Sequence, residues 1–182
     1  MMHVAIVYES LFGNTRQVAE AIGEGVRAAH PDAEIDCLRV DEADPEGLGP
    51  VDLLVVGGPT HIHGMSSGFS RKMGVESERK KIAEGQPVQE PEPGAEGPGV
   101  RSWLQSLPKA GSHPHGAAFD TRAAFPTSGG AAHGIARRLR RHGYDVVAEP
   151  IGFVVEGADG PLRTGELDRA RAWGSELTAK DS

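Results

Sequence analysis

The chain has 182 residues and a formal net charge of −7, which is enough for one domain with a buried core and short for two. The net negative charge argues against a nucleic-acid partner, because binding to a phosphate backbone requires a basic surface. Cys37 is the one cysteine, so the sequence excludes an internal disulfide and any multi-cysteine metal or iron–sulfur site.

The N-terminal third alternates strand and helix patterns. We predict a first strand over about 3–8, a helix over about 14–29, a second strand over about 34–40 and a third over 51–56. No charged-then-apolar leader precedes the first strand and no apolar run reaches about 18 residues, so we expect a cytoplasmic protein without a membrane partner.

A segment of different composition follows, at about 66–99. It begins with charges of both signs and continues with prolines, glutamates and glycines, and its apolar periodicity disappears. We interpret 71–83 as an exposed helix and 84–99 as a flexible, linker-like stretch within a single domain spanning 1–182. A tolerated surface insertion is the simpler interpretation, and a mobile cover beside a ligand is the alternative.

Ordered patterns return at Val100. We predict a short amphipathic helix over 100–107, a fourth strand over 116–120, a helix over about 131–142, a fifth strand region over 144–155 interrupted by Pro150, and a last helix over about 164–179. These elements predict an α/β fold, a doubly wound five-stranded parallel sheet of order 2-1-3-4-5 in a three-layer sandwich. In this order the ligand crevice lies outside the carboxyl ends of strands one and three.

The turn after the first strand is the most informative motif. It joins a buried strand to a helix, so the first unpaired N–H groups of that helix point at whatever occupies the turn. Glycine allows close approach of the backbone, and the hydroxyl and amide side chains add uncharged donors. These features predict a pocket for a phosphate group, made by Ser10, Leu11, Phe12, Gly13, Asn14 and Thr15.

Two more loops should meet this turn at the same edge of the sheet. The loop after strand three contains Pro59, Thr60, His61, Ile62, His63 and Gly64, and the loop after strand four contains Thr121, Arg122 and Phe125. The motifs of nucleotide-triphosphate loops and of dinucleotide-binding domains are both missing after strand one, which argues against those folds.

The turn resembles the phosphate loop of the flavodoxin family, with Ser10, Gly13, Asn14 and Thr15 at matching positions. Phe12 departs from the family, which usually has a hydroxyl there. The Gly-x-Pro-Thr start of the strand-three loop is shared with flavodoxins and with related flavin-dependent quinone reductases. The resemblance implies FMN as the cofactor, with its phosphate in the turn and its isoalloxazine ring between the other two loops.

The same resemblance assigns finer roles. A peptide at His63–Gly64 would hydrogen-bond the flavin N5, and Arg122 would lie near the N1–C2=O edge or on the surface. Neither ring-bracketing loop contains the Trp or Tyr that many flavodoxins stack on the flavin, so binding should be weaker by about 1 kcal/mol.

Three functions remain open. The first is an FMN-binding electron-transfer protein that serves a redox partner protein, with no catalytic residue of its own. The alternative is an NAD(P)H-dependent quinone or small-molecule reductase, and the third is a structural or regulatory module without flavin. The pairs His61/His63 and His113/His115 supply two ligands each, which is too few for a metal site. The arginines over 137–141 are interpreted as the solvated face of a helix.

Overall fold

The computed structural model describes residues 1–61, 64–65, 99–124, 130–157 and 160–179. The predicted 71–83 helix and nearly all of the predicted 84–99 linker lie outside this part of the chain, so the expected insertion stays a prediction. Among the described residues, no helix combines the length and the apolar character needed to cross a lipid bilayer.

A mainly parallel sheet forms the centre of the molecule. Its strands run in the order β2-β1-β3-β5-β6, and β7 also pairs with β5. The bounds are β1 His3–Tyr8, β2 Glu34–Arg39, β3 Leu53–His61, β5 His115–Ala123, β6 Asp145–Val146 and β7 Ile151–Val155. The two-residue strand β4, Gly64–Met65, lies antiparallel to the end of β3.

The fifth position of the sheet is shared by two strands. β6 pairs with the start of β5, and β7 pairs with its last five residues. Pro150 lies in the gap between them, as expected for a residue without an N–H to donate to a strand ladder. The predicted order 2-1-3-4-5 is therefore confirmed, with an interruption in the last strand.

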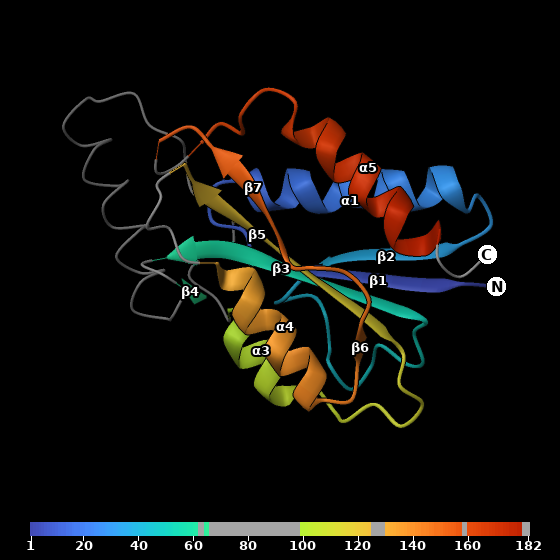
Figure 1. Cartoon of the computed structure of the whole chain (residues 1–182). Helices are drawn as coiled ribbons and strands as arrows, with labels where there is room; N and C mark the ends of the chain where they lie inside the picture. The colour runs from blue at the N-terminus through green and yellow to red at the C-terminus, as the bar shows by residue number, and fades with distance from the viewer. Residues whose placement is uncertain (62–63, 66–98, 125–129, 158–159, 180–182) are drawn as a thin grey trace.

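Helices cover both faces of the sheet (Figure 1). α1 Asn14–Ala29 and α5 Glu166–Ala179 cover one face, and α3 Val100–Ser106 and α4 Ala131–Arg141 cover the other. The predicted bounds of the first helix are confirmed, and those of the other three differ by one or two residues. This arrangement is the expected three-layer sandwich.

Alternation along the strands divides the core between the two faces. In β1, Val4 and Ile6 pack under α1, whereas Ala5 and Val7 pack toward α3 and α4. Three buried rings on the α1/α5 side, Phe119, Phe153 and Trp173, meet edge to face with centroids 6.3–6.4 Å apart. Each such pair adds about 1 kcal/mol to the free energy of burial.

The helices themselves follow the predicted apolar stripes. Trp103 of α3 is buried as expected, and its indole N–H donates to the Ala43 carbonyl at 2.8 Å. In α4, Ile135 and Leu139 are buried. Arg137, Arg140 and Arg141 are exposed, in agreement with the interpretation of this run as a solvated helix face.

Candidate functional site

The turn between β1 and α1 lies at the carboxyl edge of the sheet. Gly13 has a φ of 93°, a left-handed conformation that glycine adopts without steric cost, and its N–H donates to Ser10 Oγ at 3.1 Å. Within the described residues no side chain caps the first turn of α1, and that turn contains no acidic residue. The positive end of the helix is thus directed at the turn without a built-in counter-charge.

Polar side chains around this turn are buried. Ser10 is 1% exposed, Thr15 2% and Asn14 9%. Buried polar groups normally have hydrogen-bond partners, and Ser10 uses a lone pair to accept from Gly13, which leaves its hydroxyl proton for another acceptor. A phosphate oxygen is the kind of acceptor that this arrangement suits.

A hydroxyl pair connects the turn to the neighbouring strand. Thr15 Oγ1 of α1 and Thr121 Oγ1 of β5 lie 2.8 Å apart, both buried. Two hydroxyls share one hydrogen bond, so one of the two protons remains available to a ligand. The structure therefore brings Thr15 and Thr121 together, as the convergence of loops predicts.

Thr121 and Arg122 were expected in a loop after strand four, and this expectation is wrong. β5 continues to Ala123, because its last five residues pair with β7 on one side, while Thr121 pairs with Pro59 of β3 on the other. The predicted strand over 116–120 ended too early because Asp, Thr and Arg break its apolar pattern. Tertiary pairing overrides that local signal.

Arg122 does not offer an unpaired positive charge to the crevice, because its guanidinium is bound by Asp120. Its Nε and Nη2 each donate to an oxygen of Asp120 at 2.7 Å, and Asp120 also accepts from the Ala132 N–H at 2.9 Å. The Asp120 side chain is fully buried and that of Arg122 is 24% exposed. The carboxylate neutralises the guanidinium and caps α4. This pairing argues against the expected role of Arg122 as a cation beside a flavin ring.

Asp120 and Glu9 are site residues that the sequence analysis missed. Glu9 follows β1, is 4% exposed, and accepts the N–H of Val100 at the start of α3 at 2.8 Å. Each acid thus holds the beginning of a helix at the carboxyl edge. The available signal was an acidic residue at the end of an apolar strand, a pattern that by itself has several explanations.

The predicted strand-three loop is partly strand. The third strand was expected to end before Gly57, but β3 runs through Pro59 and Thr60 to His61 and turns back into β4 at Gly64. Thr60 Oγ1 accepts from the Ala131 N–H of α4 at 3.2 Å. Ile62, His63 and Phe125 lie outside the described residues, so their contacts with a flavin stay predictions, as does the His63–Gly64 peptide.

The turn has a further neighbour that the sequence did not indicate. Gly160 follows β7, has a φ of 94°, and lies so close to Asn14 that a methyl group in place of its hydrogen would collide with the Asn14 amide. The segment before α5 therefore packs on the β1–α1 turn. Glycine is needed there for both the backbone conformation and the space.

Glu166, the first residue of α5, anchors this segment. It accepts from the Val154 N–H at 2.7 Å and from Arg169 Nε at 3.0 Å. Burial by itself raises the pKa of Glu166, but the hydrogen bonds from Arg169 and Val154 and the nearby charge of Arg163 outweigh it, and the net pKa lies below its ordinary value.

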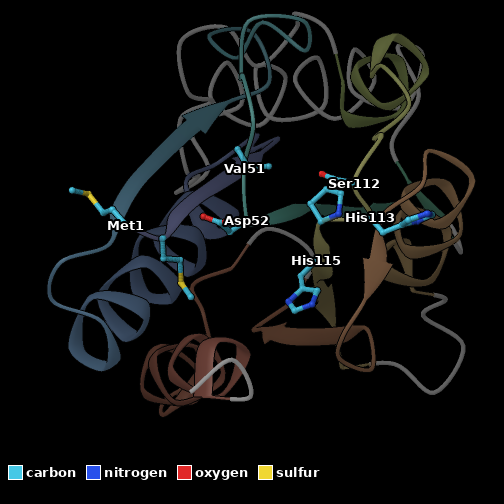
Figure 2. A pocket seen from close by; sticks show the side chains of 8 residues that line it. Met1, Val51, Asp52, Ser112, His113 and His115 are labelled. Atoms are coloured by element: carbon cyan, nitrogen blue, oxygen red, sulfur yellow. The ribbon is translucent and has the colours of Figure 1, made fainter.

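A cavity of about 510 Å³ lies elsewhere, at the amino ends of the strands (Figure 2). It is lined by Met1, Met2, Val51, Asp52, Ser112, His113, Pro114 and His115. β3 begins just after Asp52 and β5 begins at His115, so the cavity is at the edge opposite the β1–α1 turn. The position of a ligand crevice in a parallel sheet favours the carboxyl edge, and we assign the candidate site there.

No protein-family model matches the chain. A curated flavodoxin of Aquifex aeolicus is 37% identical over 62 residues, and the chain spans about a third of that relative's length, with the match covering 34% of this chain and 33% of the flavodoxin.

Solved structures match over nearly the whole chain. Flavodoxin 2 of Bacillus cereus has a TM-score of 0.66 at 18% identity, covering 98% of this chain and 99% of its own. A flavodoxin from the domain Archaea has a TM-score of 0.62 at 21% identity, covering 98% of both chains. A WrbA-like flavodoxin of Agrobacterium tumefaciens has a TM-score of 0.52 at 16% identity, covering 97% and 95%. Sheet order, helix layers and these matches agree, and the chain has the flavodoxin fold.

Proposed function

We propose that the chain binds FMN noncovalently and functions as an electron-transfer protein. The observation that carries the proposal is the β1–α1 turn, where a helix N-terminus without a side-chain cap meets the buried side chains of Ser10, Asn14 and Thr15. Residues 9–15 contain no lysine or arginine, so backbone amides and hydroxyls would hold the phosphate dianion. The flavodoxin relatives support FMN as the ligand.

The remaining residues of the site suit the other parts of FMN. The ends of β3 and β5, which contain Thr60 and Thr121, lie beside the turn and would position the isoalloxazine ring. When bound, FMN supplies the redox chemistry, because the ring itself accepts and releases electrons. The protein's contribution is binding, orientation and the exclusion of water.

The described carboxylates at this edge favour a carrier over an enzyme that moves substrate protons. Asp120 is fully buried and accepts three hydrogen bonds from Arg122 and Ala132. Glu9 is engaged by the Val100 N–H. Both acids hold the fold together at this edge, so among the described residues neither is placed as a general acid or base. A redox partner protein would then supply and receive the electrons.

A reductase that uses NAD(P)H directly is the second candidate. The Gly58-Pro59-Thr60 sequence at the end of β3 and the similarity to a WrbA-like flavodoxin favour it. Steady-state oxidation of NADPH and NADH in the presence of a quinone separates the two candidates. Turnover without any partner reductase would establish the enzyme, and reduction through a partner alone would establish the carrier.

Titration of the apoprotein with FMN and with riboflavin tests the phosphate turn directly. Hydrogen bonds to a charged group contribute about 1.5–3 kcal/mol each, so FMN should bind about 100-fold more tightly than riboflavin. Quenching of flavin fluorescence measures both affinities. Equal affinities, or no binding of either flavin, would overturn the proposal.

Two variants refine this experiment. Thr15→Val removes a hydroxyl from the turn at nearly constant volume and should reduce the FMN-to-riboflavin preference about 10-fold. Thr178→Val is the matched control, because Thr178 is also fully buried and its hydroxyl bonds the Ser175 carbonyl within α5. The control should leave the preference unchanged, whatever it does to stability.

A further inference from the structure

A cluster of metal-ligating side chains lies at the amino edge of the sheet. His3 of β1 and Glu34 and Asp36 of β2 each offer a ligand atom, and these atoms lie within 4.8 Å of one another. Glu34 is exposed, and the other two are partly buried. None of the three belongs to the site proposed for FMN.

The strand pairing explains why these side chains meet. His3 is the register partner of Glu34 in the parallel β1–β2 ladder, and Asp36 is two residues further along the same strand. Residues two apart on a strand project to the same face. The ligands are therefore held on paired backbone, which keeps the cost of organising them low.

Hydrogen bonding determines which nitrogen of His3 faces the cluster. Nδ1 lies 3.2 Å from the carbonyl oxygen of Pro50, an acceptor to which a protonated Nδ1 donates. Nε2 lies 2.7 Å from Asp36 Oδ2. In metal-binding histidines, one imidazole nitrogen commonly donates to a backbone carbonyl, which leaves the other nitrogen for the ion.

When Nδ1 carries a proton, the contact between Nε2 and Asp36 calls for a positive charge between the two acceptors. A neutral imidazole with its proton on Nδ1 would place a lone pair against a carboxylate oxygen, and both groups are acceptors. Either a second proton or a metal cation resolves this conflict.

We propose that His3, Glu34 and Asp36 form a binding site for a divalent transition-metal ion of the Zn²⁺ class. One imidazole nitrogen and two carboxylate oxygens match the ligand preferences of Zn²⁺, with water completing the coordination. On binding, the ion replaces the proton of the His3 imidazolium at Nε2, and that proton is released to the buffer.

The change of geometry needed between His3 and Asp36 is small. Two ligands of a tetrahedral Zn²⁺ lie about 3.4 Å apart, so Nε2 and Oδ2 must separate by about 0.7 Å. The Asp36 side chain is 46% exposed and can rotate into water. The ion would tie the beginning of β1 to β2 beside the Pro50 loop, and so stabilise the native state by mass action.

Calorimetric titration of the untagged, chelator-treated protein with Zn²⁺ at pH 7.5 tests the proposal, and thermal unfolding with and without Zn²⁺ gives an independent readout. The wild type should bind one equivalent and unfold at a higher temperature with Zn²⁺. Mg²⁺ should give neither effect, because it requires an octahedral, oxygen-rich site. FMN occupancy is kept the same with and without Zn²⁺ in both measurements, so failure here would leave the proposed function untouched.

Three variants locate the site. His3→Gln should weaken Zn²⁺ binding about 100-fold and Glu34→Gln about 10-fold. Glu176→Gln, the same substitution at an exposed position on α5, should bind as the wild type does. Absence of a Zn²⁺-dependent heat, or equal affinity in His3→Gln and the wild type, would overturn the site. Loss of binding only on substituting His113 and His115 would assign the ion to the cavity instead and would overturn it equally.

Discussion

The two edges of the sheet use polar residues in opposite ways. At the carboxyl edge, Ser10, Thr15, Asp120 and Thr121 are all at most 5% exposed and are bonded within the protein. At the amino edge, the polar residues line an open cavity or, like His3 and Asp36, are partly exposed. The first edge is buried and internally hydrogen-bonded, whereas the second is solvated.

The parallel arrangement of the sheet explains the difference. Every helix that follows a strand begins at the carboxyl edge and ends near the amino edge, so partial positive charge gathers at one edge and partial negative charge at the other. α1 and α4 begin beside Ser10 and Asp120 and end at Ala29 and Arg141. An anion is therefore favoured at the carboxyl edge and a cation at the amino edge.

The largest expected effect comes from the buried acid of the carboxyl edge. Asp120→Ala leaves the guanidinium of Arg122 and the N–H of Ala132 without their acceptor. Removing one partner of a buried ion pair should lower the free energy of unfolding by about 3 kcal/mol. Urea denaturation measures this change, and a loss under 1 kcal/mol would mean that the edge is more solvated than described.

Gly160→Ala should have the next largest effect, about 2 kcal/mol, because it combines a strained φ with a collision against Asn14. Gly165→Ala is the matched control: its φ is 91°, but open space surrounds the position of the added methyl group. The difference between the two variants isolates the contact with the phosphate turn. Gly160→Ala should also weaken FMN binding, and Gly165→Ala should not.

Glu166 predicts a pH dependence for the segment that packs on the turn. The folded-state pKa of Glu166 is lowered, so its stabilisation is present above the ordinary pKa of a glutamate and is lost as pH falls through the lowered value. Glu166→Gln should cost about 1.5 kcal/mol at pH 7. The gap between variant and wild type should narrow on acidification, and a gap independent of pH would contradict this assignment.

The smallest effect is expected at the amino edge. In chelator, Asp36→Asn removes a partly exposed ion pair with His3, and such pairs contribute about 0.5 kcal/mol. The same denaturation measurement used for Asp120→Ala allows a direct comparison. A loss as large as that of Asp120→Ala would abolish the distinction between a buried and a solvated edge.

Much of the fold could be predicted from local patterns of apolar residues in the sequence. The apolar spacing of Val18, Ile22 and Val26 specified α1 with its correct bounds, and the runs of buried residues specified β1 and the centre of β3. The turn between β1 and α1 could also be predicted, because strand, glycine and helix are contiguous in the sequence. These features depend on interactions between residues a few positions apart.

The tertiary structure decided the rest of the candidate site. The lengths of β3 and β5, the contact of Asp120 with the Ala132 N–H, and the hydroxyl contact of Thr15 with Thr121 depend on elements that meet only in the folded protein. The approach of Gly160 to Asn14 joins residues 146 positions apart, and the cluster of His3, Glu34 and Asp36 joins two strands across α1. Composition and periodicity carry information along the chain, whereas these contacts arise from how the sheet brings distant residues to the same edge.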